Sequence, residues 1–261
     1  MPTSISLARA LSAAGGMLLL TACGDDPSTG GATTTRAPEI ETPVVALGDG
    51  GDYAPEIDPA DFVSRIDNPY LLLLPGTRWV YEGDSDGEVE RIEVEVLPET
   101  RQIEGIAATV VRDTVYVAGE LVEDTYDWFA QDREGNVWYL GEDTHEYEDG
   151  KAINDEGAWE HGKDGAIAGI VMPAHPEVGD SFRQEFYAGE AEDMAEVLEV
   201  GVAREIDLGS YDDVVVTEDW TPLEPEIVEE KWYARGIGNI YSTHTTGKVG
   251  AVELVEFTPA P

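Results

Sequence analysis

The chain has 261 residues, with 55 Asp and Glu against 15 Lys and Arg, and a formal net charge of −40. Such an excess of negative charge repels phosphate backbones, which excludes nucleic acid as a partner. Cys23 is the only cysteine, so the chain can form neither an intramolecular disulfide nor a cysteine-based metal site. The acidity is explained either by a solvated, salt-tolerant surface or by a surface that collects cations.

Residues 1–22 have the order of a secretion signal. Arg9 precedes an apolar stretch at 10–20, which is too short to cross a bilayer core that needs about 20 helical residues. Leu20-Thr21-Ala22-Cys23 resembles the bacterial lipobox, in which the cysteine becomes the acylated N-terminus. The resemblance implies cleavage before Cys23 and lipid on that residue. It also implies an exported protein anchored to the bacterial cell membrane and facing outside the cytoplasm; the alternative is an ordinary signal peptide that contains a cysteine.

Residues 23–58 are rich in Gly, Thr, Pro, Ala and Asp without periodicity, which predicts a flexible tether. A short helix is expected at 58–65. Beyond Gly76, short aromatic and β-branched runs are separated by Gly, Asp and Asn, which is typical of strands joined by hairpins. Strands are expected at 77–83, 88–97, 107–117, 121–132, 136–140, 181–188, 194–208, 213–220, 226–234, 239–244 and 251–257.

The chain also resembles itself at an offset of 103 to 104 residues. Gly76-Thr77-Arg78-Trp79 parallels Gly179-Asp180-Ser181-Phe182, and Trp128-Phe129-Ala130 parallels Trp232-Tyr233-Ala234. In both copies a glycine turn precedes a strand and an aromatic pair follows at the same distance. These matches predict an internal duplication, and the alternative is coincidence among residue types that β proteins often use.

Each predicted copy has too few strands to cover its own apolar face. The sequence therefore predicts an all-β fold, an antiparallel barrel or sandwich of two pseudo-symmetric repeats at 59–168 and 169–261, as one compact domain. Pockets form at such interfaces. Trp128, Trp232 and Tyr233 are the candidate residues of a ligand groove between the copies, with core packing as the alternative role.

Two segments carry a family resemblance. Residues 74–81, Leu-Pro-Gly-Thr-Arg-Trp-Val-Tyr, are similar to the opening strand of bacterial lipoproteins and secreted proteins of the TapB-like, β-rich kind. Residues 231–240, Lys-Trp-Tyr-Ala-Arg-Gly-Ile-Gly-Asn-Ile, are similar to their closing pattern. The resemblance implies a β-barrel or half-barrel and carries over no functional residue.

The segment 82–93 places oxygen-bearing side chains at calcium-loop spacing, with glycine at the sixth position. The candidate Ca²⁺ ligands are Asp84, Asp86, Glu88 and Glu93. An acidic hairpin turn is the alternative, because the flanks have strand patterns; Glu88 and Glu90 would then share the solvated face. A second acidic cluster at 142–149 has the same two interpretations.

No catalytic residue is predicted. The four histidines are scattered, and the Gly-Asp-Ser at 179–181 matches a repeat partner that has no serine, so it marks a turn rather than a nucleophile. The first functional hypothesis is a non-catalytic, membrane-tethered binding module for a small molecule, a lipid or an envelope partner. A calcium-dependent structural envelope protein is the second, and a hydrolase with an unrecognised carboxylate site is the third.

Overall fold

The structure is a computed structural model, and it describes residues 53–85 and 87–261. The secretion signal, Cys23 and the candidate ligand Asp86 lie outside the described residues, so the predictions made for them stay predictions. Among the residues that are described, no helix is long and apolar enough to span a membrane. The expected helix at 58–65 is a single 3-10 turn, η1 (Pro59–Asp61), capped by the Asp58 side chain.

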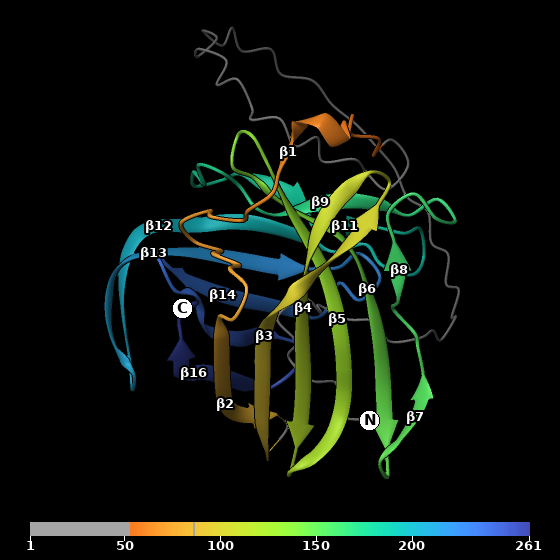
Figure 1. The fold of residues 1–261 in the computed structure, drawn as a ribbon. Coiled ribbons are helices and arrows are strands. Elements are labelled where there is room, and N and C mark those ends of the chain that lie inside the picture. The colour runs from red at the N-terminus through yellow and green to blue at the C-terminus, as the bar shows by residue number, and fades with distance from the viewer. Residues whose placement is uncertain (1–52, 86) are drawn as a thin grey trace, which may run out of the picture.

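The described chain otherwise consists of strands, which Figure 1 labels in order. Their bounds are β1 (Phe62–Val63), β2 (Arg78–Ser85), β3 (Glu88–Ile103), β4 (Ile106–Val117), β5 (Glu120–Asp132), β6 (Val137–Glu148), β7 (Lys151–Asn154), β8 (Trp159–Glu160), β9 (Ile167–Met172), β10 (Ser181–Arg183), β11 (Glu185–Phe186), β12 (Met194–Ile206), β13 (Gly209–Trp220), β14 (Val228–Ala234), β15 (Gly238–Thr246) and β16 (Gly250–Thr258). The predicted all-β class is confirmed.

One antiparallel sheet runs in the order β10-β12-β13-β14-β15-β16-β2-β3-β4-β5-β6-β9-β11. Its two end strands, β10 and β11, belong to one short segment, which pairs with β12 on one side and with β9 on the other. The sheet therefore curls back on itself into an almost closed barrel. Figure 1 shows β2 to β6 side by side along one wall and β12 to β14 crossing another.

Alternation along each strand decides which side chains enter the barrel. In β3, Glu90, Ile92 and Val94 are at most 2% exposed, whereas Arg91 and Glu93 between them are half-buried on the outer face. The interior is filled mainly by aliphatic and aromatic side chains of both walls. A smaller outer core forms on the other face of β4 to β6 and β9, where Ile57 and Phe62 pack against it.

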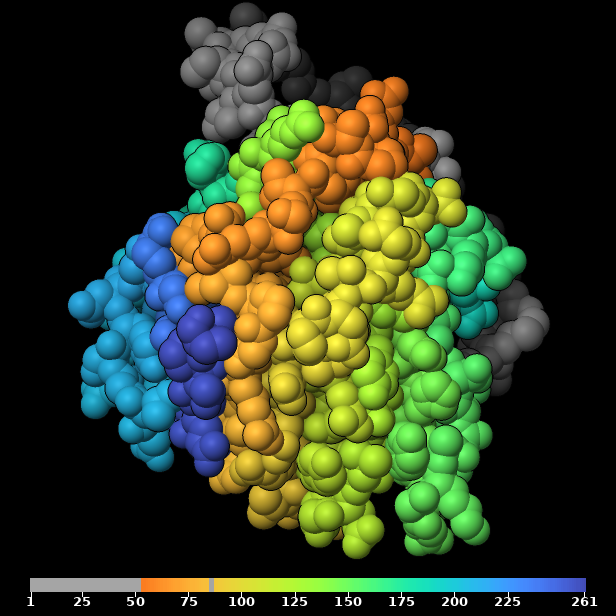
Figure 2. Space-filling model, in the orientation of Figure 1, coloured from red at the N-terminus to blue at the C-terminus, as the bar shows by residue number. Residues whose placement is uncertain are grey.

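The packed structure includes residues that composition assigned to the tether. Tyr53 is 5% exposed, its hydroxyl donates to the Ala168 carbonyl at 2.9 Å, and its ring lies 6.0 Å from that of Phe186. Residues 53–58 are therefore held against the barrel, although the small and polar residues around them resemble a linker. Figure 2 shows this N-terminal segment, in orange, lying over one end of the molecule.

The strap, residues 66–73, continues from this segment across the end of the barrel. Its Ile66, Tyr70, Leu71 and Leu73 side chains belong to the interior core. Asn68 anchors the strap: its Nδ2 donates to the carbonyls of Gly135 at 2.9 Å and Pro173 at 3.0 Å, and its Oδ1 accepts from the Tyr70 amide. One buried amide side chain thus connects the strap with two loops of the barrel.

We expect Asn68→Ala to lower the free energy of unfolding by about 2–3 kcal/mol, because it leaves buried backbone groups without their partners. Urea denaturation of the wild type and the variant measures the difference. Asn154→Ala is the control, since Asn154 donates to Glu146 in the outer hairpin of β6 and β7; its loss is expected to stay below about 1 kcal/mol. Equal losses in the two variants would contradict the anchoring role.

The strand order has an internal symmetry that bears on the predicted duplication. The segments β2-β3-β4-β5-β6-β9 and β10-β12-β13-β14-β15-β16 follow each other around the sheet, each as six antiparallel neighbours. Their connections differ in two places, because β11 lies between β10 and β12 in the chain, and β7 and β8 lie between β6 and β9. Gly76 and Gly179 also make equivalent contacts, donating to the Val96 and Val197 carbonyls respectively. The predicted boundary between residues 168 and 169 falls inside β9. The duplication and its boundary stay predictions.

Candidate functional site

The three aromatic residues predicted to line a groove do not come together. Trp128 is buried in the outer core, Tyr233 points into the barrel interior, and Trp232 lies half-buried on the opposite face of β14 from Tyr233. Trp232 and Tyr233 are consecutive in one strand, so the pleat sends their side chains to opposite faces. These three side chains therefore do not form one ligand site.

Both tryptophans are engaged in packing with arginine. The guanidinium carbon of Arg101 lies 3.9 Å from the centre of the Trp128 ring, and that of Arg204 lies 4.3 Å from the Trp232 ring. Arg204 also covers Tyr241, at 3.6 Å. These cation–π contacts occupy the faces of the rings that a flat ligand would need.

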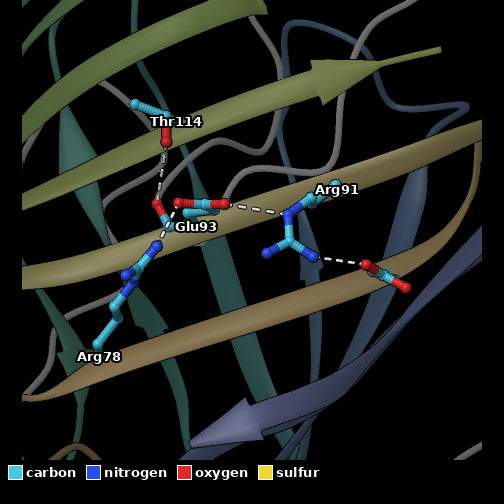
Figure 3. Close-up of polar contacts among 5 residues, drawn as sticks. Arg78, Arg91, Glu93 and Thr114 are labelled. Carbon is cyan, nitrogen blue, oxygen red and sulfur yellow. Dashed lines mark hydrogen bonds and ion pairs between the residues drawn. The ribbon is translucent and has the colours of Figure 1, made fainter. Parts of the chain in front are cut away.

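The candidate calcium loop is the hairpin of β2 and β3, and its side chains point to different faces. Glu93 lies on the outer face, where it accepts from Arg78 and from Nε of Arg91 at 3.0 Å (Figure 3). Partial burial raises the pKa of Glu93, but the hydrogen bonds from these arginines outweigh it and the pKa is lowered. Glu88 is five residues away in the same strand and so belongs to the other face.

The expectation that Glu90 faces solvent with Glu88 is wrong. Glu90 is 0% exposed, because the inward face of β3 continues beneath the hairpin end. Asp84 is used locally: its Oδ1 accepts from the Gly87 amide at 3.1 Å. Within residues 53–85 and 87–261, no group of three or more His, Cys, Asp or Glu side chains is placed to hold a metal ion. Calcium binding stays a prediction that depends on Asp86.

The barrel instead holds an acidic core, which the sequence analysis missed. We use this name for nine carboxyl side chains that are each at most 5% exposed: Glu90, Asp113, Glu123, Asp127, Glu142, Glu185, Asp193, Asp219 and Glu229. Among the described residues, the buried cationic side chains are Lys231 and Arg183. Strand alternation could have indicated some of these positions, but the abundance of surface carboxylates hid the signal.

Hydrogen bonds and two ion pairs of Lys231 organise the acidic core. Lys231 Nζ lies 3.0 Å from Asp219 Oδ2 and 3.4 Å from Glu229 Oε2, with all three side chains at most 4% exposed. On the other wall, the Tyr139 hydroxyl donates to Asp127 Oδ1 at 2.7 Å. A cavity of about 30 Å³, lined in part by Asp193, Lys231 and Tyr233, lies beneath Leu71 and Leu73 of the strap. That volume suits a water molecule rather than an organic ligand.

A much larger hollow lies where the two predicted copies meet. We call it the junction pocket; its volume is about 840 Å³, and it is lined by the segment 56–62, the loop 132–138, and residues 170–182 around the end of β9 and the start of β10. Its apolar wall is formed by Phe62, Trp138, Ile170 and Phe182. Pockets for small organic ligands typically have about 300–1,000 Å³ and mostly apolar walls.

Hydrogen bonds hold the walls of the junction pocket in place. Asp132 accepts from Trp138 Nε1 and from Asn136 Nδ2, both at 2.8 Å, and Asn136 Oδ1 accepts from the Ala174 amide at 2.9 Å. The Trp138 ring meets Phe62 edge to face, with ring centres 6.1 Å apart. The loop, the N-terminal segment and the chain after β9 are thereby fixed to one another, so the pocket is already formed without a ligand.

The rim of the junction pocket is acidic. Six carboxylate residues line it against one arginine: Glu56, Asp58, Asp61, Asp132, Glu134 and Asp180, with Arg133. Arg133 is already engaged with Asp61, at 3.7 Å. An anionic ligand would therefore meet repulsion, whereas a neutral or cationic one would not.

A groove between the copies was predicted with Trp128, Trp232 and Tyr233 as its residues, and none of the three lines the junction pocket. Phe62, Trp138 and Phe182 were not named as candidate residues of a ligand site. Phe182 is the counterpart of Trp79 in the predicted repeat, and Trp138 stands at the offset of 103 residues from Tyr241, so the two pocket residues occupy different points of the repeat. The expected groove between the two predicted copies is the signal that pointed to this junction.

Comparisons with known proteins assign no family to this chain. No protein-family model matches the chain, and no curated protein matches it. A candidate exported protein with a YmcC-like fold from Bacteroides fragilis is similar to 71% of this chain and 97% of its own, at 14% identity and a TM-score of 0.42. A candidate lipoprotein from Parabacteroides distasonis is similar over 73% of this chain and 99% of its own, at 13% identity and a TM-score of 0.34. The TapB-like resemblance stays a prediction.

Proposed function

We propose that this chain is an exported lipoprotein, anchored through lipid on Cys23, whose barrel binds a small molecule with an apolar body in the junction pocket. The pocket itself carries the proposal: about 840 Å³ between Phe62, Trp138, Ile170 and Phe182, at the meeting point of the two predicted copies. Burial of an apolar surface contributes about 25 cal/mol per Å², so a wall of this kind supports binding without any covalent step. The role is non-catalytic.

The acidic rim restricts the ligand to a neutral or positively charged molecule. Anionic lipids and organic phosphates would lose their hydration next to Asp58, Asp61 and Asp180 without gaining a counterion. A ligand with an apolar body and an amine would place the body against Trp138 and the amine toward the rim. This chemistry supports a small-molecule ligand over a phospholipid headgroup.

The test is titration of the purified full-length protein with the neutral apolar dye N-phenyl-1-naphthylamine, followed by dye fluorescence. We expect saturable binding at about one dye per chain, and at least about tenfold weaker binding of the anionic dye 1-anilinonaphthalene-8-sulfonate. Ser181→Trp places a large ring in the pocket wall and should abolish dye binding, because Ser181 is half-buried in that wall.

Ser210→Trp is the matched control, since Ser210 is exposed in the hairpin of β12 and β13, away from the pocket lining. Its dye affinity should equal that of the wild type. Equal binding by the Ser181→Trp variant, or a preference for the anionic dye, would overturn the assignment of the pocket.

A further inference from the structure

Three carboxyl groups of the acidic core, those of Asp127, Asp193 and Glu229, are at most 3% exposed. Transferring an ionised carboxylate into a low-dielectric interior costs several kcal/mol unless a cation and hydrogen bonds compensate it. Lys231 serves Asp219, Glu229 and Asp193 together, and Asp127 has the Tyr139 phenol as its hydrogen-bond donor. Side-chain cations therefore compensate Asp127, Asp193 and Glu229 only in part.

On one wall, a single ammonium group serves several carboxyls. Lys231 faces Asp219 and Glu229, and Asp193 also lies within its electrostatic reach. Asp219 is further held by Thr217 Oγ1 at 2.6 Å and Gln184 Nε2 at 3.2 Å. Oδ1 of Asp193 and Oε1 of Glu229 are buried and accept no hydrogen bond from residues 53–85 and 87–261. Both oxygens are suited to carry a proton instead.

On the opposite wall, the predicted repeat puts an acid where the cation would be. Asp127 stands at the offset of 104 residues from Lys231, and it pairs across the sheet with Val111 and Glu142. Asp113 and Glu123 act on it electrostatically, while Tyr139 donates to it. This wall therefore concentrates negative charge around Asp127, with a neutral phenol as its hydrogen-bond donor.

Burial and neighbouring negative charges both raise the pKa values of Asp127, Asp193 and Glu229. Burial first, and then the neighbouring Asp113, raise the pKa of Asp127 well above its usual range. Burial raises the pKa of Asp193 in the same way, and Asp219 adds to it, although Lys231 opposes the change. For Glu229, burial raises the pKa to about 7 against the attraction of Lys231.

We infer that the folded barrel retains protons on its acidic core at neutral pH, and that loss of these protons destabilises the barrel as the pH rises. Asp127, Asp193 and Glu229 are the proton-carrying groups. The interior is thus a pH-sensitive device built into the fold, which favours the closed barrel in acid and weakens it in base.

The groups that face these carboxyls come from several strands. Glu229 lies between Asp219 of β13 and His244 of β15, with Lys231 on its own strand and Lys248 acting from the following turn. Asp193 interacts electrostatically with Lys231, Asp219, Glu142 and Arg183 of β10, and it is hydrogen-bonded to Thr221. The two lysines and Arg183 oppose proton uptake and the acids favour it; burial, the largest contribution, decides the direction.

The direction of the pH dependence follows from linkage. A carboxyl whose pKa is higher in the folded chain binds more protons when folded than when unfolded, so stability falls as the pH rises between the two values. For Glu229 this window runs from 4.5 to about 7. Exposed carboxylates are already ionised above about pH 5.5, so the change of stability with pH above that value is due to the buried carboxyls of the acidic core.

The experiment measures proton exchange and thermal unfolding of the full-length protein. At pH 7 in weak buffer, unfolding by urea should release at least about one proton per chain. The midpoint of thermal unfolding, Tm, should fall by at least about 4 °C between pH 5.5 and 8. Glu229→Gln and Asp127→Asn should each reduce both effects, and the exposed Glu99→Gln should change neither.

Proton uptake on unfolding, or a Tm that rises over this range, would overturn the inference. So would a fall of Tm on adding EDTA, because it would assign the charge balance to a bound metal ion instead of protons. If either core variant fails to fold, the proton release of the wild-type protein still decides between the outcomes.

Discussion

Lys231→Met is expected to lower the free energy of unfolding by about 3–5 kcal/mol at pH 8, the largest effect of any single change considered for this chain. The methionine side chain keeps the volume but removes the ammonium group from between Asp219 and Glu229. Two buried carboxylates would then lack their compensating charge. Urea denaturation at constant temperature measures the loss.

The same variant should be less impaired at pH 5.5. In the absence of Lys231 the Glu229 carboxyl, whose pKa burial already raises, can take up a proton, which replaces part of the missing compensation. Lys163→Met is the control, because Lys163 is 60% exposed and pairs with Glu160 at the surface; about 0–1 kcal/mol is expected there. An equal loss at both pH values would contradict the role assigned to Lys231.

Gly169→Ala is expected to cost about 3 kcal/mol, at the upper end of the usual cost of overpacking. Gly169 lies in β9, where the sheet closes against the segment of β10 and β11. A Cβ at this position would come within 2.3 Å of the Arg183 carbonyl oxygen and 2.4 Å of the Gln184 carbonyl carbon. These are backbone atoms, and the Gln184 amide is bonded to the Asp193 carbonyl at 2.8 Å, so they have little room to move.

Gly209→Ala is the matched control for this prediction. Gly209 opens β13, and a Cβ added there has no heavy atom within 4 Å. Its unfolding free energy should lie within about 0.5 kcal/mol of the wild type. If Gly169→Ala unfolds at the same urea concentration as Gly209→Ala, the prediction is wrong, because the close approach of the Arg183 and Gln184 backbone to Gly169 then does not limit stability.

Most of the strands could be predicted because their signals are local. The expected strands at 107–117, 121–132 and 213–220 lie within β4, β5 and β13, which extend them by a few residues at most. Each is bounded by turn residues and enriched in β-branched or aromatic side chains. The strand β9 was missed, since its sequence, Ile-Ala-Gly-Ile-Val-Met, is short and contains a glycine. That glycine is needed because another strand of the barrel approaches it closely.

The candidate sites were less predictable, since they depend on which face of a strand becomes the interior. Trp232 and Tyr233 look equivalent in the sequence, but only Tyr233 enters the barrel. Glu90 resembles the many exposed acids of this chain, and it is fully buried. A shift by one residue would exchange both assignments, because side chains alternate with a period of two.

The sequence by itself determined the fold class, the positions of most strands and the strong negative charge, because composition and periodicity act within a few neighbouring residues. Only the tertiary structure decided where the sheet closes, which carboxyls it buries and which aromatics meet across the junction pocket. Phe62 and Phe182 are 120 residues apart in the chain, and they line one pocket because β10 and β11 return to β12 and β9. Contacts of this kind depend on closure of the whole barrel, which no local pattern encodes.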